Sequence, residues 1–172
     1  MRKNSTAEAD YVAFVEARRA GLRRLAYTVS GDWHEAEDLV QITLAKLYVA
    51  WPRIRRAGAE DAFARRTLMR SFLDERRRPR QRERPTAEIP DRTARTPEPA
   101  IEVRGPLLEA LQELPAMQRS VVVLRHWTDL SVEQTAAALG ISTGTVKSHN
   151  SRGLARLSEL LADQRLDLRS TR

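Results

Sequence analysis

The chain has 172 residues, of which 41% are hydrophobic and 31% are charged, and it carries a net charge of +7. This composition predicts a folded protein with small cores, and the absence of cysteine excludes disulfides, thiol catalysis and cysteine-ligated zinc. No segment approaches the roughly 18 apolar residues of a membrane-spanning helix, and the first residues, MRKNSTAEADYV, lack the apolar core of a signal peptide, so we expect a cytoplasmic protein without membrane insertion.

Apolar residues at helical spacing predict three helices in the first half of the chain. The first is expected to cover about 20 residues, around positions 11–29. Asp32, followed three residues later by Glu35, predicts a capping box at the start of the second helix, whose inner face includes Tyr48. Pro52 should end or kink that helix. The segment RRAGAEDA is interpreted as a loop that precedes the third helix.

A proline-rich segment divides the chain into two helical modules. Residues 79–104 have no apolar stripe and predict a flexible linker. The second module begins near Pro106, since proline is favoured in the first turn of a helix, and Pro115 separates its first two helices. The predicted fold is therefore all-α, with two small helical domains at residues 1–78 and 105–172.

The segment from Ser131 to Leu157, SVEQTAAALGISTGTVKSHNSRGLARL, has the pattern of a helix-turn-helix. Ala136 allows two helices to approach closely, and Gly140 permits the positive φ of a tight turn. With Val146 buried, the outer face of the last helix carries hydroxyls and cations, which contact phosphates and base edges in a major groove. A helical hairpin with a polar solvent face is the alternative. The candidate DNA-reading residues are Thr143, Thr145, Lys147, Ser148, Ser151 and Arg152.

Arginines are concentrated between residues 65 and 84, where nine arginines accompany three acidic residues. This density predicts binding to nucleic-acid phosphates with a strong dependence on salt, although a solvated charged surface gives the same pattern. The nearby aromatic residues are Trp51, Phe63 and Phe72, and aromatic rings stack on unpaired bases. We expect Trp51 and Phe72 to lie in the core instead.

These segments, in this order, resemble those of bacterial sigma factors of the sigma-70 family. The similarity is to the extracytoplasmic-function group and its SigE-like subfamily, promoter-specificity subunits of RNA polymerase, and it covers nearly the whole chain. AEDLVQ is similar to region 2.2, which docks on the clamp of the largest polymerase subunit. FARRTLMRSFLDERRR resembles regions 2.3 and 2.4, which melt and read the −10 promoter element. The segment from LQELPAMQRS to SRGLARL resembles region 4, which reads the −35 element and touches the flap of the second-largest subunit.

The resemblance implies partners and site residues. The partners are core RNA polymerase and promoter DNA, an anti-sigma factor is common in the family, and no cofactor is expected. Asp38, an outward-facing Leu39 and Gln41 are the implied polymerase-docking residues. The segment 56–62 occupies the place where family members hold a flipped-out −10 base. The implied −10 contacts are Phe63, Arg65, Arg66, Arg70, Arg76 and Arg77.

Some positions depart from the pattern of the family or of an ideal helix. Arg70 stands where many members have asparagine, and His149 and Asn150 replace basic and aliphatic residues, so Asn150 is expected to loosen packing. Gly153 lies inside the last predicted helix at a cost of about 1 kcal/mol relative to alanine, with no evident reason in the sequence. Leu154 is expected on the inner face of that helix.

The sequence does not predict an enzyme. His34, His126 and His149 lack the spacing of a metal site, and GISTGT lacks the lysine of a phosphate-binding loop. Two other functions are open at this point. A stand-alone helix-turn-helix regulator would use the first module for dimerisation or sensing. A site-specific recombinase would need a catalytic domain that contains strands.

Overall fold

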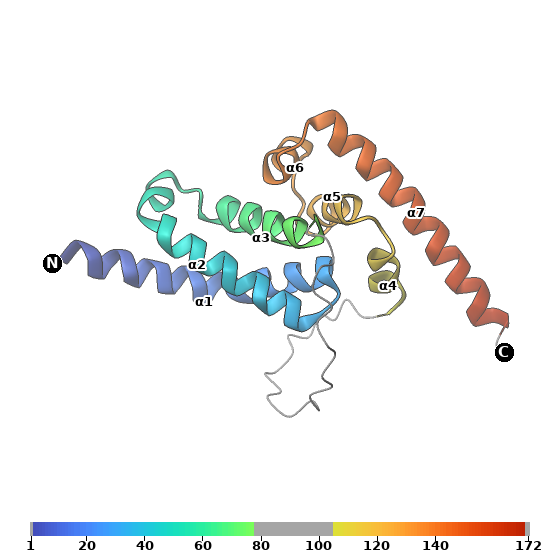
Figure 1. Ribbon diagram of the computed structural model, residues 1–172, viewed down its shortest axis with the longest axis horizontal. Helices are drawn as coiled ribbons and strands as arrows, with labels where there is room; N and C mark the ends of the chain where they lie inside the picture. Colours follow the sequence, from blue (N-terminus) through green and yellow to red (C-terminus); the bar gives the residue numbers. More distant parts are fainter. Residues whose placement is uncertain (1, 78–104, 171–172) are drawn as a thin grey trace, which may run out of the picture.

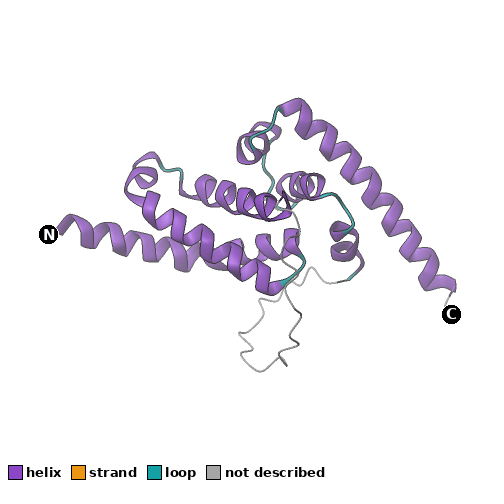
Figure 2. Ribbon diagram, viewed as in Figure 1, coloured by secondary structure: helices purple, strands orange, loops and turns teal. Residues whose placement is uncertain are grey.

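The described part of the chain contains only α-helices and the turns between them (Figures 1 and 2). The computed structural model describes residues 2–77 and 105–170, with side chains described for residues 6–77 and 105–163. The predicted all-α fold is confirmed, and the predicted linker at residues 79–104 lies outside the described residues. The helices are α1 (Arg2–Ser30), α2 (Trp33–Ala57), α3 (Glu60–Arg77), α4 (Pro106–Gln112), α5 (Ala116–His126), α6 (Val132–Leu139) and α7 (Thr143–Ser170).

In the first half of the chain, α2 runs back along α1 and α3 returns along α2 (Figure 1). At 29 residues, α1 is longer than predicted, because no glycine or proline precedes Gly21 to interrupt it. Gly31 makes the turn into α2 with a φ of 76°, a left-handed conformation that glycine adopts without strain.

Pro52 was predicted to end or kink α2. It does not end the helix, which continues to Ala57. Buried Trp51 and Ile54 hold the helix in the core on both sides of the proline. The end of the helix is set instead by Gly58, whose left-handed conformation at the C-cap lets its N–H reach the carbonyl of Arg55 at 3.2 Å. The predicted loop RRAGAEDA is therefore reduced to Gly58 and Ala59.

The capping box predicted at the start of α2 forms only in part. The Asp32 carboxylate accepts a hydrogen bond from the Glu35 amide at 2.8 Å, as expected of an N-cap. The Glu35 side chain does not return to the Asp32 amide, which donates to the Ser30 hydroxyl. Glu35 instead pairs with Arg76 of α3 at 2.9 Å. The Glu35 carboxylate therefore pairs with Arg76, which is distant in the sequence, and not with the Asp32 amide as the sequence suggested.

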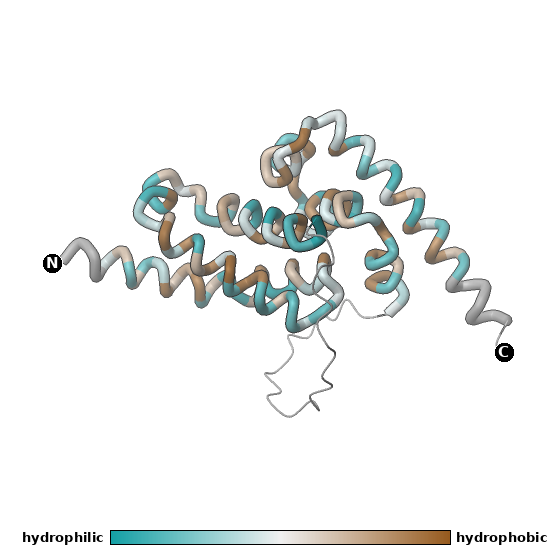
Figure 3. The backbone as a smooth tube through the Cα atoms, in the orientation of Figure 1, coloured by the Kyte–Doolittle hydropathy of each residue, from teal (hydrophilic) through white to brown (hydrophobic). Residues whose placement is uncertain are grey.

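The main hydrophobic core draws residues from both halves of the chain. Val29 and Phe72 of the first half and Leu111 and Val122 of the second belong to one continuous buried cluster. A smaller cluster around Trp51 packs α2 on α1, and Figure 3 shows hydrophobic positions alternating with hydrophilic ones along the helices. Trp51 and Phe72 are core residues, as predicted. Since apolar burial is the main stabilising contribution to folding, the two helical modules support each other.

In the second half, α4, α5 and α6 are short and pack against one face of the long helix α7. Ser131 forms the predicted capping box with Gln134 at the start of α6. Val146, Gly153 and Leu157 lie on the buried face of α7. Leu154 does not: its side chain is 40% exposed, because one residue of helix turns about 100° away from Gly153.

Gly153 now has a packing explanation. It lies where α7 crosses α5, and a Cβ atom at this position would come within 2.7 Å of the Val122 Cγ2 atom. The helices therefore approach more closely than a side chain permits, which offsets the low helix propensity of glycine.

We expect Gly153→Ala to lower the free energy of unfolding by about 1 kcal/mol, because overpacking costs about 1–3 kcal/mol and alanine returns about 1 kcal/mol of helix propensity. The matched control is Gly21→Ala, in the interior of α1, where the added Cβ would meet no heavy atom within 4 Å apart from the adjoining residues of its own helix. That substitution should raise the free energy of unfolding by up to about 1 kcal/mol. Urea denaturation measures both, and equal stabilisation would show that the α5–α7 crossing is not tight.

Candidate nucleic-acid interface

The unit formed by α6, the turn at Gly140 and α7 has the geometry of a helix-turn-helix. Gly140 adopts a φ of 69° at the C-cap of α6, and Ala136 and Val146 are buried where the two helices meet. The Ser142 hydroxyl accepts a hydrogen bond from the Thr145 amide at 3.1 Å and so caps the start of α7. The N-terminal half of α7 is thus held rigidly with its outer face in solvent.

The predicted DNA-reading residues lie together on that outer face of α7. Lys147 and Arg152 are exposed, and neither forms an ion pair with another described residue. Thr145 is less available, because it is half-buried and its hydroxyl hydrogen-bonds to the Ser142 hydroxyl at 2.8 Å. The remaining members are Thr143 and Ser151, which are exposed, and Ser148, which is half-buried. Hydroxyls and unpaired cations on one face suit phosphate and base-edge contacts.

Asn150, which was expected to loosen packing, has a polar partner on another helix. Its side-chain oxygen lies 3.0 Å from Nε2 of His126, so a protonated Nε2 donates to it and ties α7 to α5. The polar residue that departs from the family pattern has a polar partner from another helix, which sequence spacing did not reveal.

The arginines of α3 form a second basic face. Arg66, Arg70 and Arg77 are exposed, whereas Arg65 is half-buried. Arg76 is engaged within the protein, because it pairs with Glu35 and its guanidinium lies 5.1 Å from the centre of the Phe72 ring. All six predicted −10 residues therefore lie on α3, but they differ in how exposed they are and in whether they pair within the protein.

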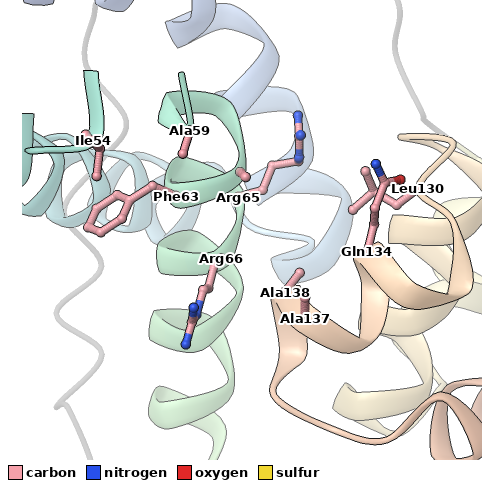
Figure 4. A pocket seen from close by; sticks show the side chains of 10 residues that line it. Ile54, Ala59, Phe63, Arg65, Arg66, Leu130, Gln134, Ala137 and Ala138 are labelled. Atoms are coloured by element: carbon pink, nitrogen blue, oxygen red, sulfur yellow. The ribbon is translucent and has the colours of Figure 1, made fainter. Parts of the chain in front are cut away.

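Phe63 and two of these arginines line a cavity of about 300 Å³ between the two halves of the chain (Figure 4). Phe63, Arg65 and Arg66 come from the start of α3, and the opposite wall comes from Leu130 and the α6 residues Gln134, Ala137 and Ala138. Phe63 is half-buried beside the smaller core cluster, so part of its ring remains available for contact.

The residues predicted to dock on the polymerase divide between the two sides of α2. Asp38 and Gln41 are exposed. The prediction that Leu39 faces outward is wrong: its side chain is 1% exposed and belongs to the main core. Leu39 lies about one helical turn from Ala36 and from Thr43, and it shares with them the buried face of α2.

The sequence analysis missed three exposed apolar residues on α2. Tyr48, predicted to be buried, is 55% exposed, and Val49 is 83% exposed. We call the exposed surface formed by these residues the α2 stripe; its members are Asp38, Gln41, Ile42, Tyr48 and Val49. These positions are three, four and seven residues apart, and this helical spacing was the signal in the sequence that would have revealed the stripe.

Comparison with known proteins decides what these surfaces belong to. Residues 14–83 match the family model described as Sigma-70 region 2, and residues 104–157 match Sigma-70, region 4. The RNA polymerase sigma-E factors of Streptomyces avermitilis and Streptomyces coelicolor are each 38% identical to the chain over 161 residues, covering 94% of it and 90% and 91% of their own lengths. The chain belongs to the sigma-70 family of RNA polymerase sigma factors. It is SigE-like and of the extracytoplasmic-function type.

Two further relatives extend this assignment. The extracytoplasmic-function sigma factor SigE of Mycolicibacterium smegmatis is 36% identical over 146 residues, which are 81% of this chain and 56% of that protein. The sigma factor RpoE of Bartonella quintana, solved in complex with the anti-sigma factor NepR, superimposes with a TM-score of 0.62 at 28% identity, covering 89% of this chain and 97% of that one.

Membership of the family settles the predicted class of function. The protein is a transcription initiation factor with region 2 and region 4 DNA-binding domains; it is not an enzyme, and it acts with core RNA polymerase. The region 2 match replaces both alternatives, the stand-alone regulator and the recombinase. Among the described residues, no helix has the length and apolar character needed to cross a membrane.

Proposed function

We propose that region 2 comprises residues 1–78 and region 4 residues 105–172, and that they read two promoter elements about two helical turns apart while α2 holds the polymerase. The observation that carries this proposal is that Lys147 and Arg152 are exposed on the outer face of a rigid helix-turn-helix and form no ion pair with another described residue. The protein would act where the polymerase works, in the cytoplasm.

The −35 element would be read by α7 and the −10 element by α3. On α7, short hydroxyl side chains would position the helix on phosphates and the cations would contact base edges. On α3, the exposed Arg66, Arg70 and Arg77 would hold the phosphates of the melted strand, and the half-buried Phe63 would stack on a base. Arg65 and Arg76 would contribute less to this contact, since Arg65 is half-buried and Arg76 pairs with Glu35.

The polymerase contacts would use apolar residues that the fold leaves in water. The α2 stripe suits the clamp of the largest subunit, because apolar side chains beside a carboxylate and an amide have the composition of an interface centre with a polar rim. In region 4, exposed Trp127 and Leu154 offer an apolar contact to the flap of the second-largest subunit. The complex of the Bartonella neighbour with NepR supports the proposal that an anti-sigma factor binds this protein too.

Reconstituted transcription tests the proposal. Purified protein and core RNA polymerase, incubated with genomic DNA fragments, should give transcripts with discrete 5′ ends, each preceded by shared −10 and −35 sequences. Core polymerase alone should give none of these starts. Permanganate should detect unpaired thymines at the −10 element only when both components are present. Specific binding to duplex DNA by the free protein, without any start from the polymerase, would overturn it.

A further inference from the structure

The cavity between α3 and α6 has mostly apolar walls (Figure 4). Its volume of about 300 Å³ lies at the lower end of the range of small-molecule sites, which is about 300–1,000 Å³. The apolar lining residues are Ile54, Ala59 and Phe63 on one side and Leu130, Ala137 and Ala138 on the other. The cavity is therefore large enough for the apolar body of a small organic molecule.

Phe63 gives one wall of the cavity an aromatic surface that is already held in place. Its ring packs against the smaller core cluster, which contains Leu47, Trp51 and Ile54, and Figure 4 shows the ring next to Ile54. Phe63 is half-buried, so the cluster fixes one part of the ring and leaves another part exposed. A ligand can pack on this exposed part without first ordering the side chain.

The charged residues that line the cavity are both arginines. Arg65 and Arg66 follow Phe63 on α3, and among the described lining residues none is acidic. Neither guanidinium forms an ion pair with another described residue, and Arg65 is half-buried, which reduces the screening of its charge by water. Two unpaired guanidinium groups beside an apolar space suit a carboxylate, which arginine binds through two parallel hydrogen bonds.

Gln134 adds a neutral hydrogen-bond donor on the α6 side. Its Oε1 accepts a hydrogen bond from the Ser131 amide at 2.8 Å in the capping box of α6, and this bond orients the side chain. The Nε2 group has no hydrogen-bond partner among the described residues and remains able to donate. A few fixed polar groups around a mostly apolar space are typical of a small-molecule site.

We propose that the cavity between α3 and α6 binds a small organic acid, whose apolar body packs on Phe63 and Ala138 and whose anionic group pairs with Arg65 and Arg66. Positive charge on both arginines disfavours a cationic ligand, and a neutral ligand would leave the guanidinium groups unpaired.

The proposed site has a consequence for transcription. Phe63, Arg65 and Arg66 are also proposed contacts of the −10 strand, so a bound acid and the melted DNA compete for the same side chains. The organic acid therefore lowers promoter melting. This consequence rests on the proposed reading role of α3, whereas the binding site itself does not.

Calorimetric titration of the free protein tests the site. The probes are naphthoate, an acid with an aromatic body, and decanoate, an acid with an aliphatic body. We expect one-to-one binding, and the tighter of the two acids identifies the kind of body that the cavity prefers. Naphthamide has the same rings as naphthoate without the charge, and it should bind at least about tenfold more weakly because the charged contact to arginine is lost.

Three variants place the ligand in this cavity. Arg65→Gln and Arg66→Gln should each weaken binding of the acid by about tenfold. Ala137→Trp should abolish binding without a change of charge, because the indole ring fills the space; Ala137 is exposed, so the helix accommodates the ring. The matched controls are Arg24→Gln and Ala17→Trp, at exposed positions of α1 that do not line the cavity, and both should bind as the wild type does. Circular dichroism checks the fold, and the two arginine variants decide if Ala137→Trp is not folded.

The absence of binding by both acids would overturn the proposal. So would equal affinities for naphthoate and naphthamide, or an affinity unchanged in both arginine variants. Tighter binding of thymidine monophosphate than of either acid would assign the cavity to a nucleobase instead.

Failure of the proposed function is seen separately. Binding is measured without polymerase or DNA, so a protein that gives no promoter-specific transcripts can still bind the acid. In reconstituted transcription, the tighter-binding acid should reduce the permanganate reactivity of the −10 element. Unchanged reactivity at a saturating concentration would overturn the competition between the acid and the promoter.

Discussion

Replacing Val49 by aspartate is expected to weaken binding to core RNA polymerase by about 100-fold, because burial of a valine side chain contributes about 1.5–3 kcal/mol and a buried, unpaired carboxylate adds a desolvation cost. The fold should not change, since the Val49 side chain is 83% exposed. Ile42→Asp should act in the same direction. Titration of labelled protein with core polymerase measures the affinity.

Val12→Asp is the matched control. Val12 is also an exposed valine in a long helix of region 2, but it lies on α1 and outside the α2 stripe. Its replacement introduces the same charge with no expected loss of polymerase affinity. Equal losses for Val12→Asp and Val49→Asp would show a general effect of added negative charge and would count against docking by the α2 stripe.

The structure also changes which residue should be mutated. The sequence suggested a joint replacement of Asp38 and Leu39 by alanine, with the fold left intact. Leu39 is buried in the main core, and replacement of a buried leucine by alanine costs about 2–5 kcal/mol of stability. Such a variant would lose polymerase binding through unfolding as well as through docking. Asp38→Ala alone, at an exposed position, separates the two effects.

Local patterns predicted much of this protein because they depend on neighbours in sequence. Helical periodicity and the glycine at 140 were enough for the helix-turn-helix, and Ser131 with Gln134 was enough for a capping box. The same rule failed in part at Glu35, because Arg76, 41 positions away, offered a stronger partner. Helical periodicity also predicted the buried face of α2, but it did not show that Tyr48 lies outside that face.

The arrangement of the two regions lay beyond sequence reasoning for a related reason. In the sequence, Arg119 looks like an ordinary charged residue of a helix. Nothing near it indicates that it donates to the carbonyl of Val29 in α1, 90 residues earlier. Gly153 and Asn150 likewise acquire meaning only from residues of α5, Val122 and His126. Each case involves a contact between helices, which the spacing of residues within one helix does not contain.

Arg152→Ala is expected to lower the affinity of the polymerase holoenzyme for promoters by about 10- to 100-fold while leaving its affinity for unrelated DNA nearly unchanged. A bidentate contact from arginine to a base edge contributes about 1–3 kcal/mol of discrimination, whereas a phosphate contact strengthens binding to every sequence alike. Arg152 is free to make the base contact, because it is exposed on the outer face of α7 and forms no ion pair with another described residue.

Arg156→Ala provides the comparison one turn further along α7, where the guanidinium pairs with Glu159 at 3.1 Å. It removes the same charge from the same helix, so any general electrostatic effect appears in both variants. Binding is measured on a promoter with an intact −35 element, on the same promoter with that element scrambled, and over a range of salt concentrations. If Arg152 reads a base, its variant loses affinity only for the intact promoter. A uniform loss on both DNAs, with the salt slope reduced by about one, would assign Arg152 to a phosphate and leave the reading of the −35 element to Lys147 and the hydroxyl residues of α7.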